Sequence, residues 1–277
     1  MSLNYKKLKV QKHNFLQLTG VKVEEFDKIV ELVKPLWQST VESKKKTAGR
    51  TARLKTIEDK VLCVLIYYRT YITHSFLGYL FNLHNANICR LIKKIEPLLA
   101  KKITITKDRS LTPEKVLKLL ADVSEQPTQR PKRKQKKTYS GKKKQHTLKT
   151  EIVIEETGKI LAVSKSYKGR VHDFRIRKQE KLLPVNSVKY GDSGYQGWQK
   201  LQANVVIPFK RSKKKPLNQE QKEHNKRLAS FRMRVEHKIR QIKIFRIMAY
   251  TYRNFQKKYG MRFNIIAGIV NLKYTTA

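Results

Sequence analysis

A formal net charge of +42 on 277 residues is the feature that most limits what this chain can fold into. Like charges in such number repel one another and destabilise any compact state. The hydrophobic share of 39% still allows a packed core, so we expect a folded protein that binds a polyanion. Nucleic acid is the expected partner, and a basic protein that merely stays in solution is the alternative.

The sequence changes character near residue 105. Residues 1–105 carry 20 lysines and arginines against 8 acids, and their apolar residues recur at helical spacing. Residues 106–277 carry 43 against 13, and strand patterns alternate with helical ones. We therefore predict an all-α DNA-binding domain over 1–105, followed by an α/β domain with a mixed sheet over 106–277.

The first helices are predicted from apolar spacing and from caps. An apolar stripe covers residues 23–36, where Pro35 is expected to kink or shorten the helix. A polar segment, 43–55, separates it from a second helix. Thr56 is the expected N-cap of that helix, because acids follow in its first turn.

Two short helices with a three-residue turn between them are predicted next. The first covers residues 75–81, and the second begins near Asn85 and ends near residue 99. This is a helix-turn-helix pattern, in which the second helix enters the major groove of DNA. The early residues Asn85, Asn87 and Arg90 are then candidates to contact bases or phosphates. An ordinary helical hairpin has the same spacing and remains the alternative.

The second domain begins with a strand-like run, 116–123, and continues with a β-hairpin, two short strands and three helices. The hairpin is predicted over 148–155 and 160–166, the strands over 188–191 and 204–209, and the helices over 172–183, 222–247 and 259–272. Residues 126–149 contain ten lysines and arginines and no acid. That segment is interpreted either as a disordered solvated loop or as a clamp on a phosphate backbone, and both can hold together.

Acids are scarce in the second domain, so their positions are informative. Asp122 and Asp192 each follow a strand-like run, where open α/β sheets build their sites, although an aspartate there can simply cap a turn. On the helix over 222–247, Glu236 borders an apolar face and lies within about 40° of Arg232, Arg240 and Lys243. A surface glutamate in ion pairs is the alternative.

Three carboxylates that converge would repel one another without a cation. Hard divalent ions take oxygen ligands, so Asp122, Asp192 and Glu236 are the predicted ligands of Mg²⁺, or Mn²⁺, as two ions. Two such ions can activate an attacking water or 3′-hydroxyl and stabilise the leaving oxygen of a phosphodiester. Arg232, Arg240 and Lys243 would then hold the phosphates.

Four motifs together resemble the DDE-type transposases of bacterial insertion sequences, in the group that also resembles the Harbinger nucleases. They are ADVSEQPTQRP at Asp122, GRVHDFRI at Asp173, KYGDSGYQG at Asp192 and FRMRVEHKIRQIKIFR at Glu236. The resemblance implies a ribonuclease-H-like fold in which Asp122, Asp192 and Glu236 are catalytic. Arg232 and Lys243 match the last motif, whereas Ala229 stands where a tyrosine is usual. His172 and Asp173 also match, and we interpret them as structural support.

The resemblance implies a transposase that binds the ends of a mobile element, cuts them and joins them to a target. Double-stranded DNA is the expected partner, and the joining of two ends implies a homo-oligomer. A relative that only binds DNA, and a metal-dependent endonuclease without strand transfer, are the alternatives. No small-molecule substrate or membrane contact is expected. Two cysteines without a disulfide or zinc pattern, and no hydrophobic leader, predict a cytoplasmic, nucleoid-associated protein.

Overall fold

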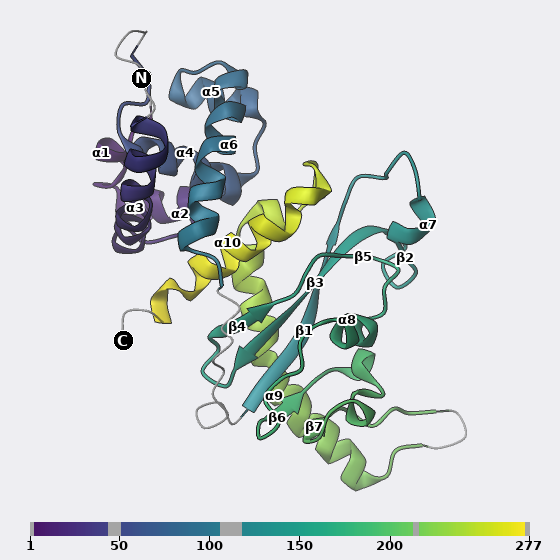
Figure 1. The fold of residues 1–277 in the computed structure, drawn as a ribbon. Coiled ribbons are helices and arrows are strands. Elements are labelled where there is room, and N and C mark those ends of the chain that lie inside the picture. Colours follow the sequence, from purple (N-terminus) through teal and green to yellow (C-terminus); the bar gives the residue numbers. More distant parts are fainter. Residues whose placement is uncertain (1–2, 44–50, 106–117, 213–215, 275–277) are drawn as a thin grey trace. The chain divides into compact units, whose positions relative to one another are not determined.

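The protein forms two compact units, seen in a computed structural model that describes residues 3–43, 51–105, 118–212 and 216–274 (Figure 1). The helical unit combines three segments, namely 1–104, 243–250 and 261–277, and the sheet unit combines 105–242 with 251–260. The predicted domain division at residue 105 stays a prediction, because two segments from the end of the sequence, 243–250 and 261–277, also belong to the helical unit. Most of the polar segment 43–55 and the start of the predicted strand at 116 lie outside the described residues.

The helical unit consists of helices joined by short connections. Its first elements are α1 Tyr5–Leu8, α2 Lys12–Thr19, α3 Val23–Trp37, the π-helix η1 Gln38–Glu42, α4 Ile57–Thr70, α5 His74–Phe81 and α6 Asn85–Lys102. Its later elements are the 3₁₀ helices η4 Arg246–Met248 and η6 Leu272–Tyr274, and α10 Tyr259–Asn271, which belongs to this unit from Met261 onward. Pro35 does not shorten α3. The chain continues to Trp37 and then widens into the π-helix. Thr56 caps α4 as predicted, because its side chain accepts a hydrogen bond from the Asp59 amide at 3.2 Å.

Most residues of helix α10 are buried, as its apolar composition requires. Gly268 lies so close to α6 that an added Cβ would fall 1.4 Å from the Ile103 carbonyl oxygen. Six residues earlier, the buried Arg262 donates to Glu96 of α6 at 2.6 Å. The last helix is therefore an integral part of this unit.

The segment 243–250 is equally integrated. The Phe245 ring packs against Gly20 at the end of α2, where an added Cβ would meet it at 3.0 Å. Gly20 has a φ of 78°, a left-handed conformation that glycine adopts at little cost. Arg69 of α4 donates hydrogen bonds to the carbonyl oxygens of Gln17 and Ile244, which fixes this segment against α2 and α4.

The sheet unit is built on a mixed sheet with the strand order β2-β3-β1-β6-β7, and with β4 and β5 also paired to β3. The strands are β1 Lys118–Pro127, β2 Tyr139–Ser140, β3 Gln145–Glu155, β4 Ile160–Val163, β5 Tyr167–Lys168, β6 Val188–Tyr190 and β7 Val205–Val206. Strand β1 is antiparallel to β3 and parallel to β6, which is parallel to β7. The predicted α/β fold with a mixed, ribonuclease-H-like sheet after an all-α region is confirmed.

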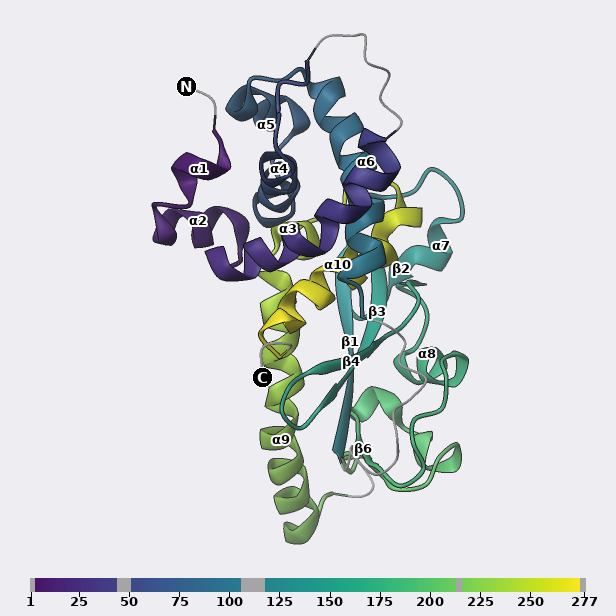
Figure 2. The same cartoon turned by 60° about the vertical axis from the view of Figure 1, so that its left-hand side comes forward.

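Helices cover the two faces of this sheet (Figure 2). On one face lies α9, Gln219–Lys243, and on the other lie α8, Asp173–Gln179, and the 3₁₀ helices η2 Ser193–Tyr195 and η3 Trp198–Lys200. The second face holds an apolar cluster of Leu119, Ala121, Val153, Leu183, Tyr195, Trp198 and Ile207. Strand β3 is buried almost throughout because both of its faces are covered.

Several predicted bounds are wrong. Helix α8 ends at Gln179 rather than 183, α9 ends at Lys243 rather than 247, and β7 has two residues rather than six. The basic segment 126–149 has defined structure: β1 continues to Pro127, and α7, Gln135–Thr138, leads into β2. The hairpin of β3 and β4 is confirmed, with Gly158 in its turn at a φ of 89°. Among the described residues, no helix has the length and apolar composition that a membrane crossing needs.

Candidate active site

Asp122 lies in the middle of β1 rather than at its end. The sequence suggested an end because Ser124 and Gln126 are polar, yet both are buried where β1 pairs with β3 as far as Pro127 opposite Thr147. The Asp122 carboxylate accepts a hydrogen bond from the Val123 amide at 2.7 Å. Pairing with β3 at Asp122, and with β6 at Lys118 to Leu120, thus fixes the strand that carries this carboxylate.

Asp192 follows β6, the parallel neighbour of β1, and so lies on the same side as Asp122. Its Oδ1 accepts a hydrogen bond from the Gly194 amide at 2.9 Å, which shapes the turn of η2. The two carboxylates repel each other. The pKa of Asp122 is raised to about 6, first because burial disfavours its charge and then because Asp192 is near. The positive charge of Arg232 acts in the opposite direction.

Helix α9 brings Arg232 and Glu236 to this pair. The Arg232 Nη2 atom lies 3.9 Å from Asp122 Oδ2 and 3.8 Å from Glu236 Oε1, so one guanidinium stands between two carboxylates. Glu236 also contributes to the raised pKa of Asp122, as the weakest of its causes. The structure therefore places Asp192 near Asp122, and Arg232 between Asp122 and Glu236.

The other residues predicted on α9 are spread along the helix. Leu228, Val235 and Ile242 are buried as the predicted apolar face requires, and Lys238 is buried beside them, with its ammonium 3.0 Å from Gln241 Oε1. Arg240 is exposed one turn beyond Glu236, and Lys243 is the last residue of the helix. The Glu236 side chain is 57% exposed, further out than a border position suggests.

Asp122 and Asp192 have the chemistry that a hard divalent ion needs, because they offer carboxylate oxygens near each other and the charge of Asp122 is unfavourable where it lies. With the side chains in these positions, the three acids do not yet form a complete metal site. Within the described part of the chain, no three histidine, cysteine or acidic side chains are close enough together to hold a metal ion. Glu236, paired with Arg232 and largely exposed, is the ligand that would have to turn inward.

Two ion pairs fix α8 to β3 beneath the Asp192 turn. The Lys149 ammonium donates to Asp173 Oδ1 at 2.9 Å and to the Val171 carbonyl oxygen. Asp173 also packs against Gly194, where an added Cβ would lie 2.9 Å from Asp173 Oδ2. His172 precedes the helix and is exposed, and its side chain makes no cap hydrogen bond. These contacts favour support of the turn by Asp173.

The second ion pair is one that sequence reasoning missed. Arg177 of α8 donates to Glu151 of β3 at 2.6 Å, and both side chains are at most 3% exposed. The buried Tyr195 hydroxyl donates to the same carboxylate at 2.9 Å, which ties the Asp192 turn to β3. Burial raises the pKa of Glu151 to about 7, although Arg177 and Tyr195 favour its charged form. The available sequence signal was an acid in the middle of an apolar strand.

The helix-turn-helix in the helical unit is formed by α5, the turn 82–84 and α6. Gly78 makes the turn possible, because an added Cβ would lie 2.3 Å from the Leu83 carbonyl oxygen. The N-cap of α6 is His84 rather than Asn85, and its side chain accepts from the Ala86 amide at 3.3 Å. Asn85, Asn87 and Arg90 are all exposed at the start of α6.

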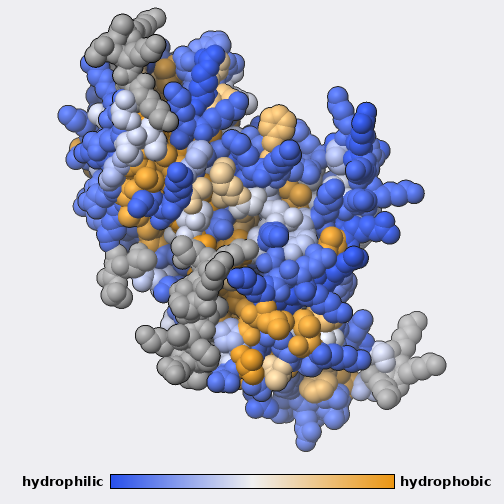
Figure 3. Space-filling view, viewed as in Figure 1, coloured by the Kyte–Doolittle hydropathy of each residue, from blue (hydrophilic) through white to orange (hydrophobic). Residues whose placement is uncertain are grey.

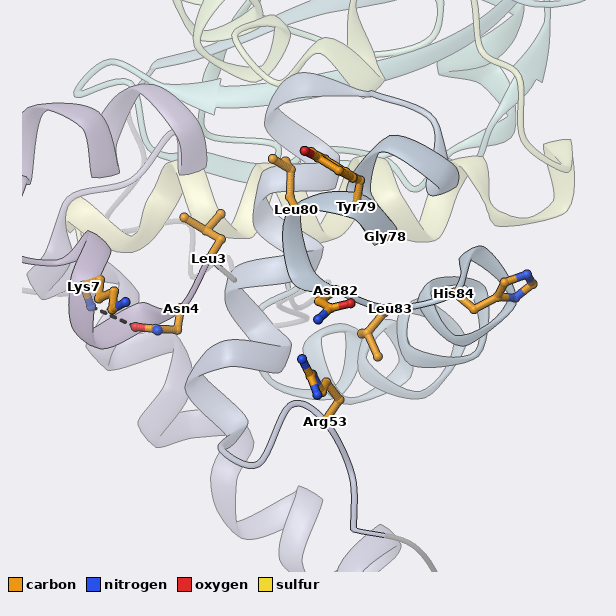
Figure 4. A pocket seen from close by; sticks show the side chains of 10 residues that line it. All are labelled: Leu3, Asn4, Lys7, Arg53, Gly78, Tyr79, Leu80, Asn82, Leu83 and His84. Carbon is orange, nitrogen blue, oxygen red and sulfur yellow. Dashed lines mark hydrogen bonds between the residues drawn. The ribbon is translucent and has the colours of Figure 1, made fainter. Parts of the chain in front are cut away.

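A pocket of about 860 Å³ adjoins this turn (Figure 4). Asn82 and Leu83 of the turn face Arg53, while Leu3 and Lys7 of the N-terminal segment form another part of its wall. The Leu3 amide donates to the Leu80 carbonyl oxygen at 2.9 Å, which anchors that segment to α5. Two cations are thereby placed beside the helix-turn-helix.

Comparison with known proteins finds two family models that match different parts of the chain. Residues 121–271 match the family model described as DDE superfamily endonuclease, and residues 52–105 match the model of the helix-turn-helix of that superfamily. The chain is 39% identical over 263 residues to a protein of Microchaete diplosiphon named "Probable transposase for insertion sequence element IS702". That match covers 93% of each chain.

Proposed function

The chain belongs to the DDE superfamily of endonucleases, and from this membership we propose that it is the transposase of a mobile DNA element. It binds the ends of the element, cuts a phosphodiester there to leave a 3′-hydroxyl, and joins that hydroxyl to target DNA. The observation that carries the proposal is that Arg232 lies between Asp122 and Glu236 in the matched region, with Asp192 near enough to Asp122 to raise its pKa.

Asp122, Asp192 and Glu236 are the proposed metal ligands. Members of this superfamily generally use divalent metals, and we propose Mg²⁺ or Mn²⁺ as two ions. Such ions would supply activation of the attacking oxygen and stabilisation of the leaving oxygen. β1 and the turn after β6 hold two of the ligands rigidly, while α9 carries the third on an exposed side chain.

Arg232 is proposed to have a second role besides balancing the carboxylates. Its guanidinium is only at the outer limit of an ion pair with each acid, so it can turn toward a DNA phosphate when metal neutralises those acids. The exposed Arg240 would extend this contact by about two helical turns along α9, and Lys243 by about three. Ala229 leaves out a tyrosine that the family motif usually has before this arginine.

The helix-turn-helix is proposed to recognise the element ends. Asn85, Asn87 and Arg90 are exposed in the first two turns of α6, where a recognition helix contacts base edges. Arg90 donates to Asn87 at 2.9 Å, so the pair forms one surface rather than two separate groups. Because two ends must be brought together for joining, we further propose that the protein acts as a homo-oligomer on DNA.

A joining assay tests the catalytic proposal. The full chain is incubated with labelled, pre-cut element ends, a target plasmid and Mg²⁺, and joined products are counted. Joining by the wild type and none by Asp192→Asn supports a transposase. Cleavage of uncut ends without any joining would instead make the protein an endonuclease, and binding without either reaction would make it a DNA-binding relative.

Recognition is best tested by substitution. Deletion of residues 1–105 would strip α10 and the segment 243–250 of the helices they pack against, so that variant would lose more than its DNA contacts. Asn87→Ala with Arg90→Ala should weaken binding to element ends while binding to unrelated DNA is kept. Equal footprints from this variant and the wild type would show that α6 does not recognise the element ends.

A further inference from the structure

A second pocket, of about 680 Å³, lies in the basic segment of the sheet unit. Its walls come from the start of that segment, from α7, from the β2–β3 pair and from the loop after β5: Arg130, Gln135, Lys136, Tyr139, Gly141, His146 and Arg170. None of these described lining residues carries a carboxylate. In Figure 3, hydrophilic side chains surround the place that α7 and β2 take in Figure 1.

The cations of this pocket are arranged to receive an anion. Arg130 donates from Nε and Nη2 to Gln135 Oε1 at 2.9 and 2.7 Å, which holds the guanidinium plane against α7. A guanidinium fixed in this way keeps further N–H groups for a phosphate. Lys136 and Arg170 reach the same pocket from two other stretches of chain, so three positive charges converge there.

The pocket also contains an aromatic platform. The Tyr139 side chain is 44% exposed, and its ring meets that of His146 edge to face with centroids 5.7 Å apart. Tyr139 and His146 are paired residues of β2 and β3, and the Thr138 hydroxyl lies 2.8 Å from His146 Nδ1. The backbone and a side-chain hydrogen bond therefore hold both rings in place, with one ring open to a ligand.

The β3 ladder relates this pocket to the carboxylates in the same unit. Ile152 lies opposite Asp122, and His146 lies six residues further along the strand. At about 3.4 Å per residue this is about 20 Å, which corresponds to roughly six base pairs of a DNA duplex. One DNA molecule can thus occupy the carboxylates and the pocket together.

We propose that this pocket binds one unpaired nucleotide of the DNA substrate, which rests on the proposed function above. The base stacks on Tyr139, and Arg130, Lys136 and Arg170 hold the phosphate. A base within a duplex is already stacked on its neighbours, so only an unpaired one can offer its face to the ring. The pocket volume is within the range of about 300–1,000 Å³ in which small ligands are bound.

The test uses the full chain, EDTA to prevent cleavage, and a fluorescent oligothymidylate of about 12 nucleotides, whose binding is followed by anisotropy. Tyr139→Ala should weaken binding by about tenfold, whereas Tyr139→Phe should restore it to within about twofold. A duplex of the same length should bind both variants alike. Phe255→Ala, which removes an 86% exposed aromatic ring elsewhere in the unit, is the matched control.

Two outcomes overturn the proposal. One is equal binding of the single strand by Tyr139→Ala and the wild type, and the other is a Tyr139→Phe variant as weak as Tyr139→Ala. Thermal melting of each variant shows that a weakened one is still folded. Arg130→Gln and Arg170→Gln should each reduce the slope of log binding constant against log salt concentration by about 0.7 for the single strand. Unchanged slopes would show that these arginines do not contact the phosphate.

Failure of the pocket proposal can be distinguished from failure of the proposed function. If Asp192→Asn abolishes cleavage while Tyr139→Ala binds oligothymidylate like the wild type, only the pocket proposal is wrong. If Asp192→Asn still cleaves while Tyr139→Ala weakens binding, the catalytic assignment is wrong and the nucleotide pocket stands.

Discussion

The two faces of the central sheet each carry an arginine paired with carboxylates, and the pairs are built differently. On the α8 face, Arg177 and Glu151 lie 2.6 Å apart and are at most 3% exposed. On the α9 face, Arg232 lies 3.8 to 3.9 Å from Asp122 and Glu236, whose side chains are 18% and 57% exposed. A buried, close pair has its charges satisfied by the protein. A loose, open pair leaves carboxylate oxygens for a cation from solution.

The difference between the faces is sharpest in activity. Asp192→Asn should lower DNA cleavage by at least about ten-thousandfold, because a proposed metal ligand is lost. Its melting temperature should stay near that of the wild type. Glu156→Gln is the matched control, since that exposed carboxylate pairs with Lys118 and Arg234 in the same unit. Full cleavage by Asp192→Asn would contradict the site.

Substitution on the α8 face should act on stability instead. Arg177→Met leaves the Glu151 charge buried without its partner, so the free energy of unfolding should fall by about 3–5 kcal/mol. The double variant Arg177→Met with Glu151→Leu should recover part of that loss, because no unpaired charge remains. Urea denaturation of the single and double variants measures both. Additive losses would mean that the two residues are not coupled.

Arg232→Met tests the loose pair directly. We expect cleavage to fall by about 10- to 100-fold, equivalent to about 1–3 kcal/mol of lost phosphate and charge contacts. Stability should change little, in contrast to Arg177→Met, because this arginine is held at the limit of both ion pairs. If Arg232→Met unfolds the protein as readily as Arg177→Met does, the two faces do not differ in the way we infer.

The smallest effect expected is on the pH dependence of stability. The folded-state pKa of Asp122, about 6, is above its ordinary value of 3.8, so without metal this group's stabilising contribution is complete below pH 3.8 and lost as pH rises through about 6. Mg²⁺ competes with the proton and should stabilise the protein at pH 7.5 but not at pH 5. At ten times its Kd, the gain is about 1.4 kcal/mol. Thermal melting with and without Mg²⁺ measures it, and Asp122→Asn should abolish the difference.

Apolar periodicity, caps and family motifs predicted most of the fold, and they singled out the acids that we propose as catalytic. Thr56, the α5–α6 turn and the β3–β4 hairpin follow from local chemistry, and local chemistry is what a sequence pattern records. The pattern failed where tertiary contacts decided the outcome. Ser124 and Gln126 look like a loop and yet continue β1, because β3 pairs with them.

The supporting ion pairs on the α8 face could not be predicted for the same reason. Lys149 and Glu151 are two residues apart in one strand, which places both side chains on the same face of the sheet. Their partners, Asp173 and Arg177, are set one turn apart on a helix that docks from more than 20 residues away. Only the docking of α8 shows that the two pairs match in charge and spacing.

The helical unit draws on residues 243–250 and 261–277 as well as on the first 104. A ribosome makes those segments after residues 1–104 and most of the sheet unit, so α6 has its full set of packing partners only once residues 243–277 have been made. A chain that stops early within the sheet unit would lack Phe245, Arg262 and the helix that Gly268 fits against α6. If α6 binds the element ends as proposed, copies that stop before residue 243 would compete poorly for those ends.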